Sequence, residues 1–434
     1  MSTTIAGTAL QEALAQARAR YASANPASLA AHLEAAAVMP GGNTRSVLFH
    51  KPFPLTMTRG EGCRLWDADG HEYVDLLGEY TAGLYGHSNP LIRTAVIEAL
   101  NGGWNLGGHG AMEARLARLI CDRFPSIELV RFTNSGTEAN LMALGTAAAM
   151  TGRPSVMVFN GGYHGGVLAF AGGGSPVNVP YDWVVGRYND AAGATALIER
   201  HGAGLGAILV EPMLGSGGCI PAGRDFLQAL RAGADRSGAL LIFDEVMTSR
   251  MSAGGQQARL GILPDMTTLG KYIGGGMSFG AFGGRRDIME RYDPRRTDAL
   301  PHAGTFNNNV LSMAAGVAGL TSLFTPAAAE ALFERGEALR DRLNGTSAGL
   351  NMQWTGLGSL MTVHFQPGPL LRPEDAAPDL GLKELFFFDM LAAGFYLARR
   401  GMLALSLEIG SEEIEGFGAA VQEFAERRRP LLRS

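Results

Sequence analysis

The sequence predicts an α/β fold, because short apolar runs alternate with helical patterns through the middle of the chain. Strands that alternate with helices need crossover connections, and these build a mainly parallel sheet. Runs such as SVMVF and ALLIF are apolar at every position, which is typical of a sheet covered on both faces. From about Met313, long helices flank a few short strands. This change of pattern predicts a second, smaller α+β domain.

Composition narrows the class of protein. The chain has 434 residues, and at about 100–200 residues per domain this suggests one large α/β domain with a smaller partner, or two to three domains. A formal net charge of −5 gives no overall electrostatic basis for nucleic-acid binding. No apolar run reaches the roughly 18 residues of a membrane span, and no secretion signal is expected. Three scattered cysteines indicate neither a disulfide framework nor a zinc site, so we expect a reducing, cytoplasmic location.

The N-terminal part of the chain, residues 1–85, is expected to be a helix and hairpin segment that belongs to the small domain. An amphipathic helix comes first. A β-hairpin then spans residues 64–77 and turns at Asp69–Gly70, a dipeptide suited to a tight hairpin turn. Pro90 opens the next helix, because proline suits the first helical turn.

Residues 86–312 are expected to form the large domain. Strands are predicted at LVRFTNS, SVMVFNGG, AILVEPM, ALLIFDE, TTLGK and GAFGG, with helices at EANLMALGTAAAM and DFLQALRAGADRSG. Residues 313–434 are expected to form the small α+β domain. There we predict helices at AAAEALFERGEALRDRLN and KELFFFDMLAAGFYLARR, and strands at SLMTVHF and MLALSL.

Polar residues follow the apolar runs where parallel strands end and ligands bind. Asp244 ends ALLIFD, Glu211 follows AILV, and Lys271 follows TTLG and precedes a string of glycines. A lysine shielded from water becomes a nucleophile able to form a Schiff base. A nearby carboxylate would suit the ring nitrogen of pyridoxal phosphate (PLP). Taken alone, Lys271 fits a surface lysine, and Asp244 fits a helix cap or a partner of Arg250.

Anion sites are expected at two polar stretches. Ser135, Gly136 and Thr137 stand between a strand and a helix, where free backbone N–H groups suit a phosphate. Thr305, in HAGTFNNN, stands in a stretch expected to start the following helix. Taken alone, an ordinary helix cap is the simpler explanation of either stretch.

An aromatic residue in GGYHGG is the candidate for stacking on a flat cofactor. The ring of Tyr163 suits this contact, and the glycines allow close approach. Its neighbour His164 has no second ligand at helical spacing, so no metal site is expected.

As an ordered set, these stretches resemble the class III (ω-type) aminotransferases, a branch of the fold type I PLP enzymes that includes glutamate-1-semialdehyde aminomutase. The matching stretches are PGG at Pro40, YGHSNP, RFTNSGTEANLMAL, GGYHGG, VEPM, LLIFDEVMTSR, TTLGKYIGGG and HAGTFNNN. The resemblance implies a mainly parallel seven-stranded sheet in the large domain and a homodimer with active sites at its interface. Ser249 departs from the glycine of many relatives, which affects the expected shape of that loop.

The resemblance also implies individual roles. Lys271 carries the internal aldimine and Asp244 holds the pyridine nitrogen. The expected cofactor-binding set is completed by Ser135, Gly136 and Thr137 at the phosphate, Tyr163 on the ring, Glu211, and Thr305 reaching the phosphate of the neighbouring subunit. Lys271 then moves the proton that transfers the amino group, and a keto acid takes that group in a ping-pong cycle.

Substrate choice depends on carboxylate recognition, for which an arginine fork is suited. Arg45 and Arg400 are the candidates, although a surface charge and a helix-end cation are the simpler explanations. The stretch PGGNTRSVLFHKPFPL, with GEYTAGLYGHS and the RRG tract, is similar to β-amino acid (β-phenylalanine type) aminotransferases. This likeness implies that Arg45 holds the β-amino acid carboxylate, that Arg400 serves 2-oxoglutarate or pyruvate, and that Val47 and Tyr80 line an apolar pocket.

Trp104 departs from the smaller aliphatic residue that this likeness implies at its position, and its bulk would narrow a neighbouring pocket.

Two other functions are compatible with these residues. An aminomutase would need one carboxylate site and no external keto acid. A non-catalytic PLP-binding sensor is the alternative from another class.

Overall fold

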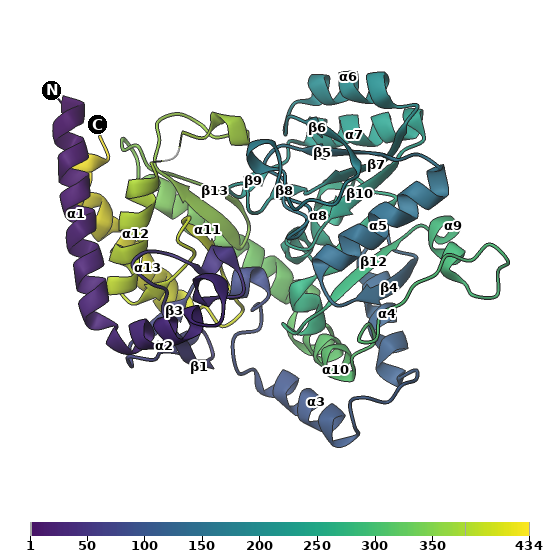
Figure 1. The fold of residues 1–434 in the computed structure, drawn as a ribbon, viewed down its shortest axis with the longest axis horizontal. Coiled ribbons are helices and arrows are strands. Elements are labelled where there is room, and N and C mark those ends of the chain that lie inside the picture. The colour runs from purple at the N-terminus through teal and green to yellow at the C-terminus, as the bar shows by residue number, and fades with distance from the viewer. Residues whose placement is uncertain (1, 378, 434) are drawn as a thin grey trace.

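A seven-stranded sheet forms the centre of the larger of two lobes (Figure 1). The structure is a computed structural model that describes residues 2–377 and 379–433. The strands are β4 (Leu129–Thr133), β5 (Ser155–Phe159), β6 (Asp182–Gly186), β7 (Leu205–Val210), β10 (Leu240–Asp244), β11 (Met266–Gly270) and β12 (Gly280–Gly284), in the order β4-β12-β11-β10-β7-β5-β6. Only β12 runs antiparallel to its neighbours. The expected mainly parallel α/β sheet of seven strands is confirmed, although β6 was not among the predicted strands.

Helices cover both faces of this sheet. On one face, α6 (Ala191–His201) and α7 (Arg224–Ser237) pack against Met157, Ile208 and Leu241. On the other, α5 (Gly136–Thr151) packs against Val156 and Leu209. Successive strand residues point to opposite faces, so both sets must be apolar. This explains why the strands are apolar throughout.

The remaining helices of this lobe surround the sheet. They are α3 (Pro90–Asn101), α4 (Ala111–Arg123), α8 (Gly255–Leu260), α9 (Arg286–Met289) and α10 (Val310–Ala318). The strands β8 (Met213–Leu214) and β9 (Ile220–Pro221) form a separate short ladder. As expected, α3 begins at Pro90, and the side chain of Asn89 caps it.

The smaller lobe combines both ends of the chain (Figure 1). Its helices are α1 (Ser2–Ala24), α2 (Pro26–Ala36), α11 (Pro326–Thr346), α12 (Leu380–Ala392) and α13 (Ser411–Arg427). One sheet contains β1 (Met57–Glu61), β2 (Arg64–Asp67), β3 (Glu72–Asp75) and β15 (Phe395–Tyr396), and another contains β13 (Gln353–Leu357), β14 (Leu360–His364) and β16 (Met402–Ala404). Because β3 pairs with β15, the N-terminal hairpin joins a C-terminal strand. The division at residues 85 and 312 stays a prediction.

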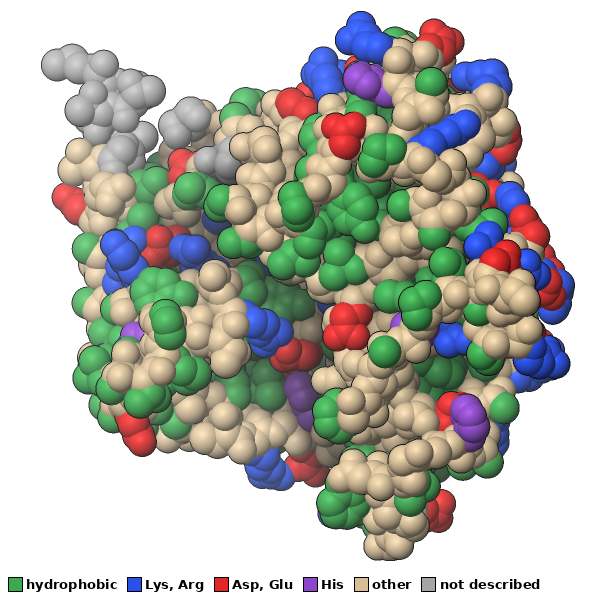
Figure 2. All heavy atoms as spheres, turned by 45° about the vertical axis from the view of Figure 1, so that its right-hand side comes forward, with side chains coloured by type: hydrophobic (Ala, Val, Ile, Leu, Met, Phe, Trp, Pro, Cys, Tyr) green, Lys and Arg blue, Asp and Glu red, His purple; other side chains and the backbone are tan. Residues whose placement is uncertain are grey.

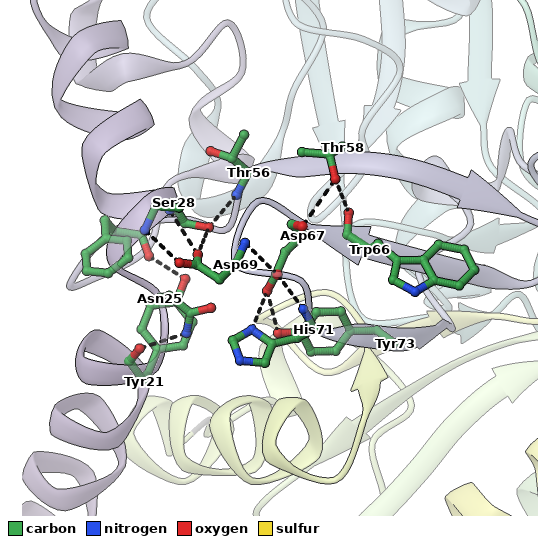
Figure 3. Close-up of polar contacts among 12 residues, drawn as sticks. Tyr21, Asn25, Ser28, Thr56, Thr58, Trp66, Asp67, Asp69, His71 and Tyr73 are labelled. Atoms are coloured by element: carbon green, nitrogen blue, oxygen red, sulfur yellow. Dashed lines mark hydrogen bonds and ion pairs between the residues drawn. The ribbon is translucent and has the colours of Figure 1, made fainter.

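The N-terminal hairpin is also tied to the first helices through its turn (Figure 3). The carboxylate of Asp69 accepts hydrogen bonds from the backbone N–H of Ala27 at 2.6 Å and of Ser28 at 2.9 Å. Both groups belong to the first turn of α2, where a negative charge is stabilising. Asp67, at the end of β2, accepts hydrogen bonds from His71 and from the hydroxyl of Tyr73. The turn therefore holds the start of α2 against the hairpin.

One predicted helix is wrong in its extent. The stretch KELFFFDMLAAGFYLARR was expected to be a single helix, but α12 ends at Ala392. Gly394 adopts a left-handed φ of +82°, a conformation that glycine reaches without steric cost. Its carbonyl then accepts the N–H of Val74 at 2.8 Å. Pairing with β3 thus outweighs the helical pattern of the segment.

The helix expected to start within HAGTFNNN begins later than Thr305. α10 starts at Val310, and the side chain of Asn309 accepts the N–H groups of Leu311 and Ser312. Thr305 lies in the turn before this cap. Among the described helices, none is by itself long and apolar enough to cross a membrane. One bent pair, Val310–Leu323 with Pro326–Thr346, meets that test by length and composition together.

Candidate active site

Lys271 lies directly after β11, at the carboxyl edge of the sheet. Its backbone has a φ of +56°, which is rare for a side chain larger than glycine. Its Nζ donates a hydrogen bond to the backbone carbonyl of Tyr80 at 2.6 Å. Burial of the amine lowers the pKa of Lys271 from 10.5 to about 8, while the negative charge of Asp244 opposes this shift. At pH 7 about a tenth of the amine is therefore uncharged, far more than for an exposed lysine, and this neutral form can act as a nucleophile.

Asp244 ends β10, the strand next to β11, and its side chain is 4% exposed. Its Oδ2 accepts a hydrogen bond from Nδ2 of Asn140 at 2.9 Å and lies 2.8 Å from Nδ1 of His164. Its Oδ1 accepts the N–H of Val246 at 3.0 Å. Arg250 is not its partner, because that guanidinium donates to the carbonyl of Leu405. The alternative of an Asp244–Arg250 pair is thus wrong.

Asn140 and Thr268 belong to the same network and were not identified from the sequence. Asn140 lies on α5 and also donates to the carbonyl of His164 at 3.0 Å. Its Oδ1 accepts the hydroxyl of Thr268 at 2.7 Å. The available signal was an asparagine on the buried face of a helix rich in alanine and leucine, because a buried amide needs hydrogen-bond partners.

The start of α5 forms an anion site. Oγ of Ser135 caps the helix by accepting the N–H of Glu138 at 3.2 Å. In the described part of the chain, the N–H groups of Gly136 and Thr137 meet no hydrogen-bond acceptor. A Cβ on Gly165 would lie 2.2 Å from Oγ1 of Thr137, so the GGYHGG loop rests on this helix start. Free amides beside a hydroxyl at a helix N-terminus suit a phosphate.

Tyr163 and Glu211 hold that loop over the sheet edge. The N–H of Tyr163 donates to Oε2 of Glu211 at 2.9 Å, and the N–H of Gly215 donates to Oε1 at 3.0 Å. The side chain of Tyr163 remains 48% exposed. Burial raises the pKa of Glu211 to about 7, with His164 lowering it and Asp244 raising it. Because Glu211 accepts its hydrogen bonds from backbone N–H groups, the ring of Tyr163 is free to cover a ligand.

This set of donors and acceptors fits PLP. The buried carboxylate of Asp244 suits a protonated ring nitrogen, and the free amides at Gly136 and Thr137 suit the phosphate. The amine of Lys271 suits the aldehyde carbon, and Tyr163 offers an aromatic face. The four groups come from the ends of different strands, as expected for a ligand at the carboxyl edge of a parallel sheet.

The four predicted substrate residues also lie together. Tyr80 is the centre of this group, and the guanidinium carbons of Arg45 and Arg400 lie 5.7 and 5.3 Å from the centroid of its ring. Its hydroxyl donates to the carbonyl of Val47 at 3.4 Å. Because the carbonyl of Tyr80 accepts the Lys271 amine, this group adjoins the cofactor-binding residues.

Arg45 and Arg400 differ in their own partners. Nη1 of Arg45 pairs with Oε1 of Glu79 at 2.7 Å. Nη2 of Arg400 contacts the sulfur of Met402 at 3.0 Å, and its Nε is buried without a hydrogen-bond partner among the described residues. Within that same part of the chain, no carboxylate pairs with Arg400. Glu79 was not identified as a site residue from the sequence, because a single glutamate within GEYTAGLYG carries no signal of its contact with Arg45.

A hollow of about 1080 Å³ opens beside this group and is lined by Arg45, Leu48, Leu77, Glu79 and Met277, among others. Figure 2 shows a hollow between the two lobes, with basic, acidic and histidine side chains at its rim. The approach from solvent to Arg45 therefore combines apolar walls with charged groups.

Thr305 and Trp104 line a second hollow, of about 650 Å³, together with Leu106 and Phe306. Apart from Thr305, none of the cofactor-binding residues named above is among its described lining residues. Trp104 is 50% exposed and Phe306 is 59% exposed. Within the described residues no hydrogen bond joins Thr305 to Ser135, Gly136 or Thr137, although Asn307, two residues further on, accepts a hydrogen bond from Asn134 at 3.1 Å. The role of Thr305 in a neighbouring subunit stays a prediction.

The chain is similar to known aminotransferases in both sequence and structure. Residues 48–370 match the family described as "Aminotransferase class-III". The chain is 59% identical over 427 residues to a β-phenylalanine transaminase of Variovorax paradoxus, covering 98% of each chain. The crystal structure of a β-phenylalanine aminotransferase from that organism matches with a TM-score of 0.96 over 98% of this chain and 99% of that one. A glutamate-1-semialdehyde 2,1-aminomutase of Desulforudis audaxviator is 38% identical, covering 86% of this chain and 91% of that one.

Proposed function

Because this chain belongs to the class III aminotransferases, we propose that it moves the amino group of an aromatic β-amino acid, such as β-phenylalanine, to a keto acid. It is a PLP-dependent transaminase of fold type I. The observation that carries the substrate proposal is the pair of arginines at one tyrosine ring, Arg45 and Arg400 at Tyr80. Two cationic forks beside one nucleophilic lysine suit two different carboxylate substrates in turn.

The cofactor would be held by residues at the sheet edge. Gly136 and Thr137 would bind its phosphate with backbone N–H groups that meet no acceptor among the described residues, and Ser135 would keep the helix start in place. The ring of Tyr163 would cover one face, and Glu211 would hold the backbone of Tyr163. When bound, PLP supplies an electron sink for the charge that remains after a proton leaves the substrate carbon.

Asp244 would keep the proton on the ring nitrogen. Its carboxylate is buried and its oxygens already accept hydrogen bonds from Asn140 and the Val246 N–H. These contacts fix the orientation of the carboxylate. We assign Asn140 and His164 as positioning residues that act through Asp244.

Lys271 would perform the proton transfers. Its amine has a pKa of about 8, so near neutral pH it can exist with or without its proton, as a general acid–base requires. The carbonyl of Tyr80, 2.6 Å from Nζ, orients the amine while it is not bonded to a ligand.

Recognition of the two substrates would depend on different arginines. Arg45 would hold the carboxylate of the β-amino acid, and Val47 with Tyr80 would contact its aromatic side chain. Arg400 would hold the carboxylate of 2-oxoglutarate or pyruvate. We further propose a homodimer in which Thr305 reaches the partner's phosphate site, and a cytoplasmic location, which free cysteines support.

Arg45→Ala and Arg400→Ala test this assignment. We expect Arg45→Ala to raise the KM for β-phenylalanine by roughly 10–150-fold, the value of a hydrogen-bonded charge pair, with a smaller effect on the KM for the keto acid. Arg400→Ala should show the reverse pattern. Arg59→Ala is the control, because Arg59 lies on β1, stacks on Trp66 and pairs with Glu61. Equal effects of Arg45→Ala and Arg400→Ala on both KM values would show that the two sites are not distinct.

The aminomutase is the second candidate, and it rests on the 38% identity to a glutamate-1-semialdehyde 2,1-aminomutase. Such a reaction keeps the amino group within one molecule and needs no keto acid. Two arginines beside one lysine favour the aminotransferase, because the second cation would have no carboxylate to bind in a single-substrate reaction.

A further inference from the structure

Residues 78–81 form a strap with left-handed backbone. Gly78, Glu79, Tyr80 and Thr81 have φ values of +53°, +46°, +51° and +82°. For residues with a Cβ this conformation is sterically unfavourable. Such strain persists only where the surrounding structure enforces it, and it concentrates at functional sites.

Asp75 holds the entrance of the strap. Its Oδ1 accepts the N–H of Leu77 at 2.8 Å and of Gly78 at 3.0 Å, and its Oδ2 lies 2.9 Å from Nε2 of His87. The carbonyl of Gly78 accepts the N–H of Gly83 at 2.8 Å, which closes the strap into a loop. These bonds enforce the left-handed path.

In this left-handed conformation the adjacent residues Glu79 and Tyr80 contact Lys271 and the two candidate arginines. The carbonyl of Tyr80 accepts the Lys271 amine, and the Tyr80 ring lies beside both candidate arginines. The carboxylate of Glu79 pairs with Arg45 at 2.7 Å. The strap therefore brings a carboxylate of the chain itself to the arginine that we assign to the β-amino acid.

We propose that Glu79 is an internal carboxylate that occupies Arg45 until the carboxylate of the amino acid substrate displaces it. This inference rests on the proposed function. The side chains of Arg45 and Glu79 are 46% and 57% exposed, and exposed ion pairs are weak and screened by solvent. A substrate carboxylate that is already positioned at Lys271 can therefore replace Glu79 at little cost.

The ion pair between Glu79 and Arg45 would also decide which of the two arginines binds the keto acid. In the half-reaction with the keto acid, Glu79 neutralises Arg45, whereas Arg400 has no carboxylate partner among the described residues. The carboxylate of the keto acid is then directed to Arg400, and binding at Arg45 in the wrong orientation is suppressed by competition with Glu79. Glu79 would thus determine specificity through Arg45.

Glu79→Gln in the holoenzyme tests this role, because it removes the charge and keeps the length of the side chain. We expect the KM for β-phenylalanine to fall by about two- to five-fold, the effect of losing one exposed competing pair, with a smaller change in kcat. The inhibition constant of 3-phenylpropanoate, which has the carboxylate but no amine, should fall by a similar factor. Inhibition by excess 2-oxoglutarate should begin at a lower concentration.

Several variants separate this role from a structural one. Glu79→Asp keeps the charge and should restore the wild-type pattern. Glu61→Gln should leave all three values unchanged, because Glu61 pairs with Arg59. In an Arg45→Ala background, Glu79→Gln should no longer change the KM. If Glu79→Gln lowers the melting temperature, Glu79→Gly removes the same charge and relieves the left-handed strain, and its KM should fall likewise.

The outcomes distinguish the inference from the function on which it rests. If the wild type transfers the amino group of β-phenylalanine but neither Glu79→Gln nor Glu79→Gly lowers its KM or the inhibition constant of 3-phenylpropanoate, Glu79 does not compete for Arg45. If the wild type transfers no amino group from any β-amino acid, the proposed function itself is wrong.

Discussion

At the residue scale, the reactivity of Lys271 depends on the burial of its amine. Burial lowers the pKa of Lys271 to about 8, so its neutral form appears at a lower pH than that of an exposed lysine. Because the neutral amine is the nucleophile, we predict that the cofactor-free protein captures PLP with a rate that rises with pH and has a midpoint near 8. Borohydride trapping followed by mass spectrometry at a series of pH values measures this rate. A midpoint near 10.5, the ordinary lysine value, would contradict the assignment.

The sequence predicts some of these residues better than others, for a physical reason. Asp244 and Lys271 directly follow apolar strands, so their gathering at one sheet edge follows from the parallel topology. Asn140 depends on contacts with Asp244 across 104 residues, which no local pattern encodes. Glu79 reaches Arg45 only because residues 79–81 adopt left-handed backbone. Glu, Tyr and Thr rarely adopt this conformation, so the sequence gives no reason to expect it.

At the element scale, the GGYHGG loop and the start of α5 must fit closely. Gly165 has a φ of +130°, and an added Cβ would lie 2.2 Å from Oγ1 of Thr137. We predict that Gly165→Ala displaces the proposed phosphate site and raises the Kd for PLP at least about tenfold, corresponding to ~1.4 kcal/mol. Fluorescence titration of the cofactor-free protein measures this Kd.

Gly166→Ala is the matched control. An added Cβ there meets no atom within 4 Å, and its φ lies outside the left-handed region. This variant should bind PLP as the wild type does. Equal affinity in Gly165→Ala and Gly166→Ala would show that the contact between Gly165 and Thr137 does not shape the site.

Element boundaries differ in how well they can be predicted. The strand β10 and the helix α5 were predicted because periodicity and end signals agree there. α12 was predicted too long, because tertiary pairing of β15 with β3 overrides a helical pattern. A single sequence contains no information about that partner, which lies more than 300 residues earlier in the chain.

At the scale of the whole molecule, apolar side chains gather where Thr305 and Trp104 lie. Leu106 and Phe306 line the same hollow and are 60% and 59% exposed in the single chain. Clustered exposed apolar groups mark interaction surfaces. We predict a homodimer of 2 × 45.8 = 91.6 kDa by light scattering, and a shift toward monomer with weaker PLP binding in Phe306→Glu.

Leu263→Glu is the control for that surface. Leu263 is also an exposed leucine, but it precedes β11 at the amino end of the strand, away from the site. It should leave the mass and the Kd for PLP unchanged. If Phe306→Glu stays at 91.6 kDa with unaltered PLP affinity, this surface is not the dimer interface that Thr305 would need.

The central claim is amino transfer from a β-amino acid to a separate keto acid. The most direct measurement incubates the holoenzyme with β-phenylalanine, with and without 2-oxoglutarate or pyruvate, and follows the amino product by chromatography. We expect repeated turnover to glutamate or alanine only when the keto acid is present. Conversion of glutamate-1-semialdehyde without any keto acid, together with inert β-phenylalanine, would contradict it.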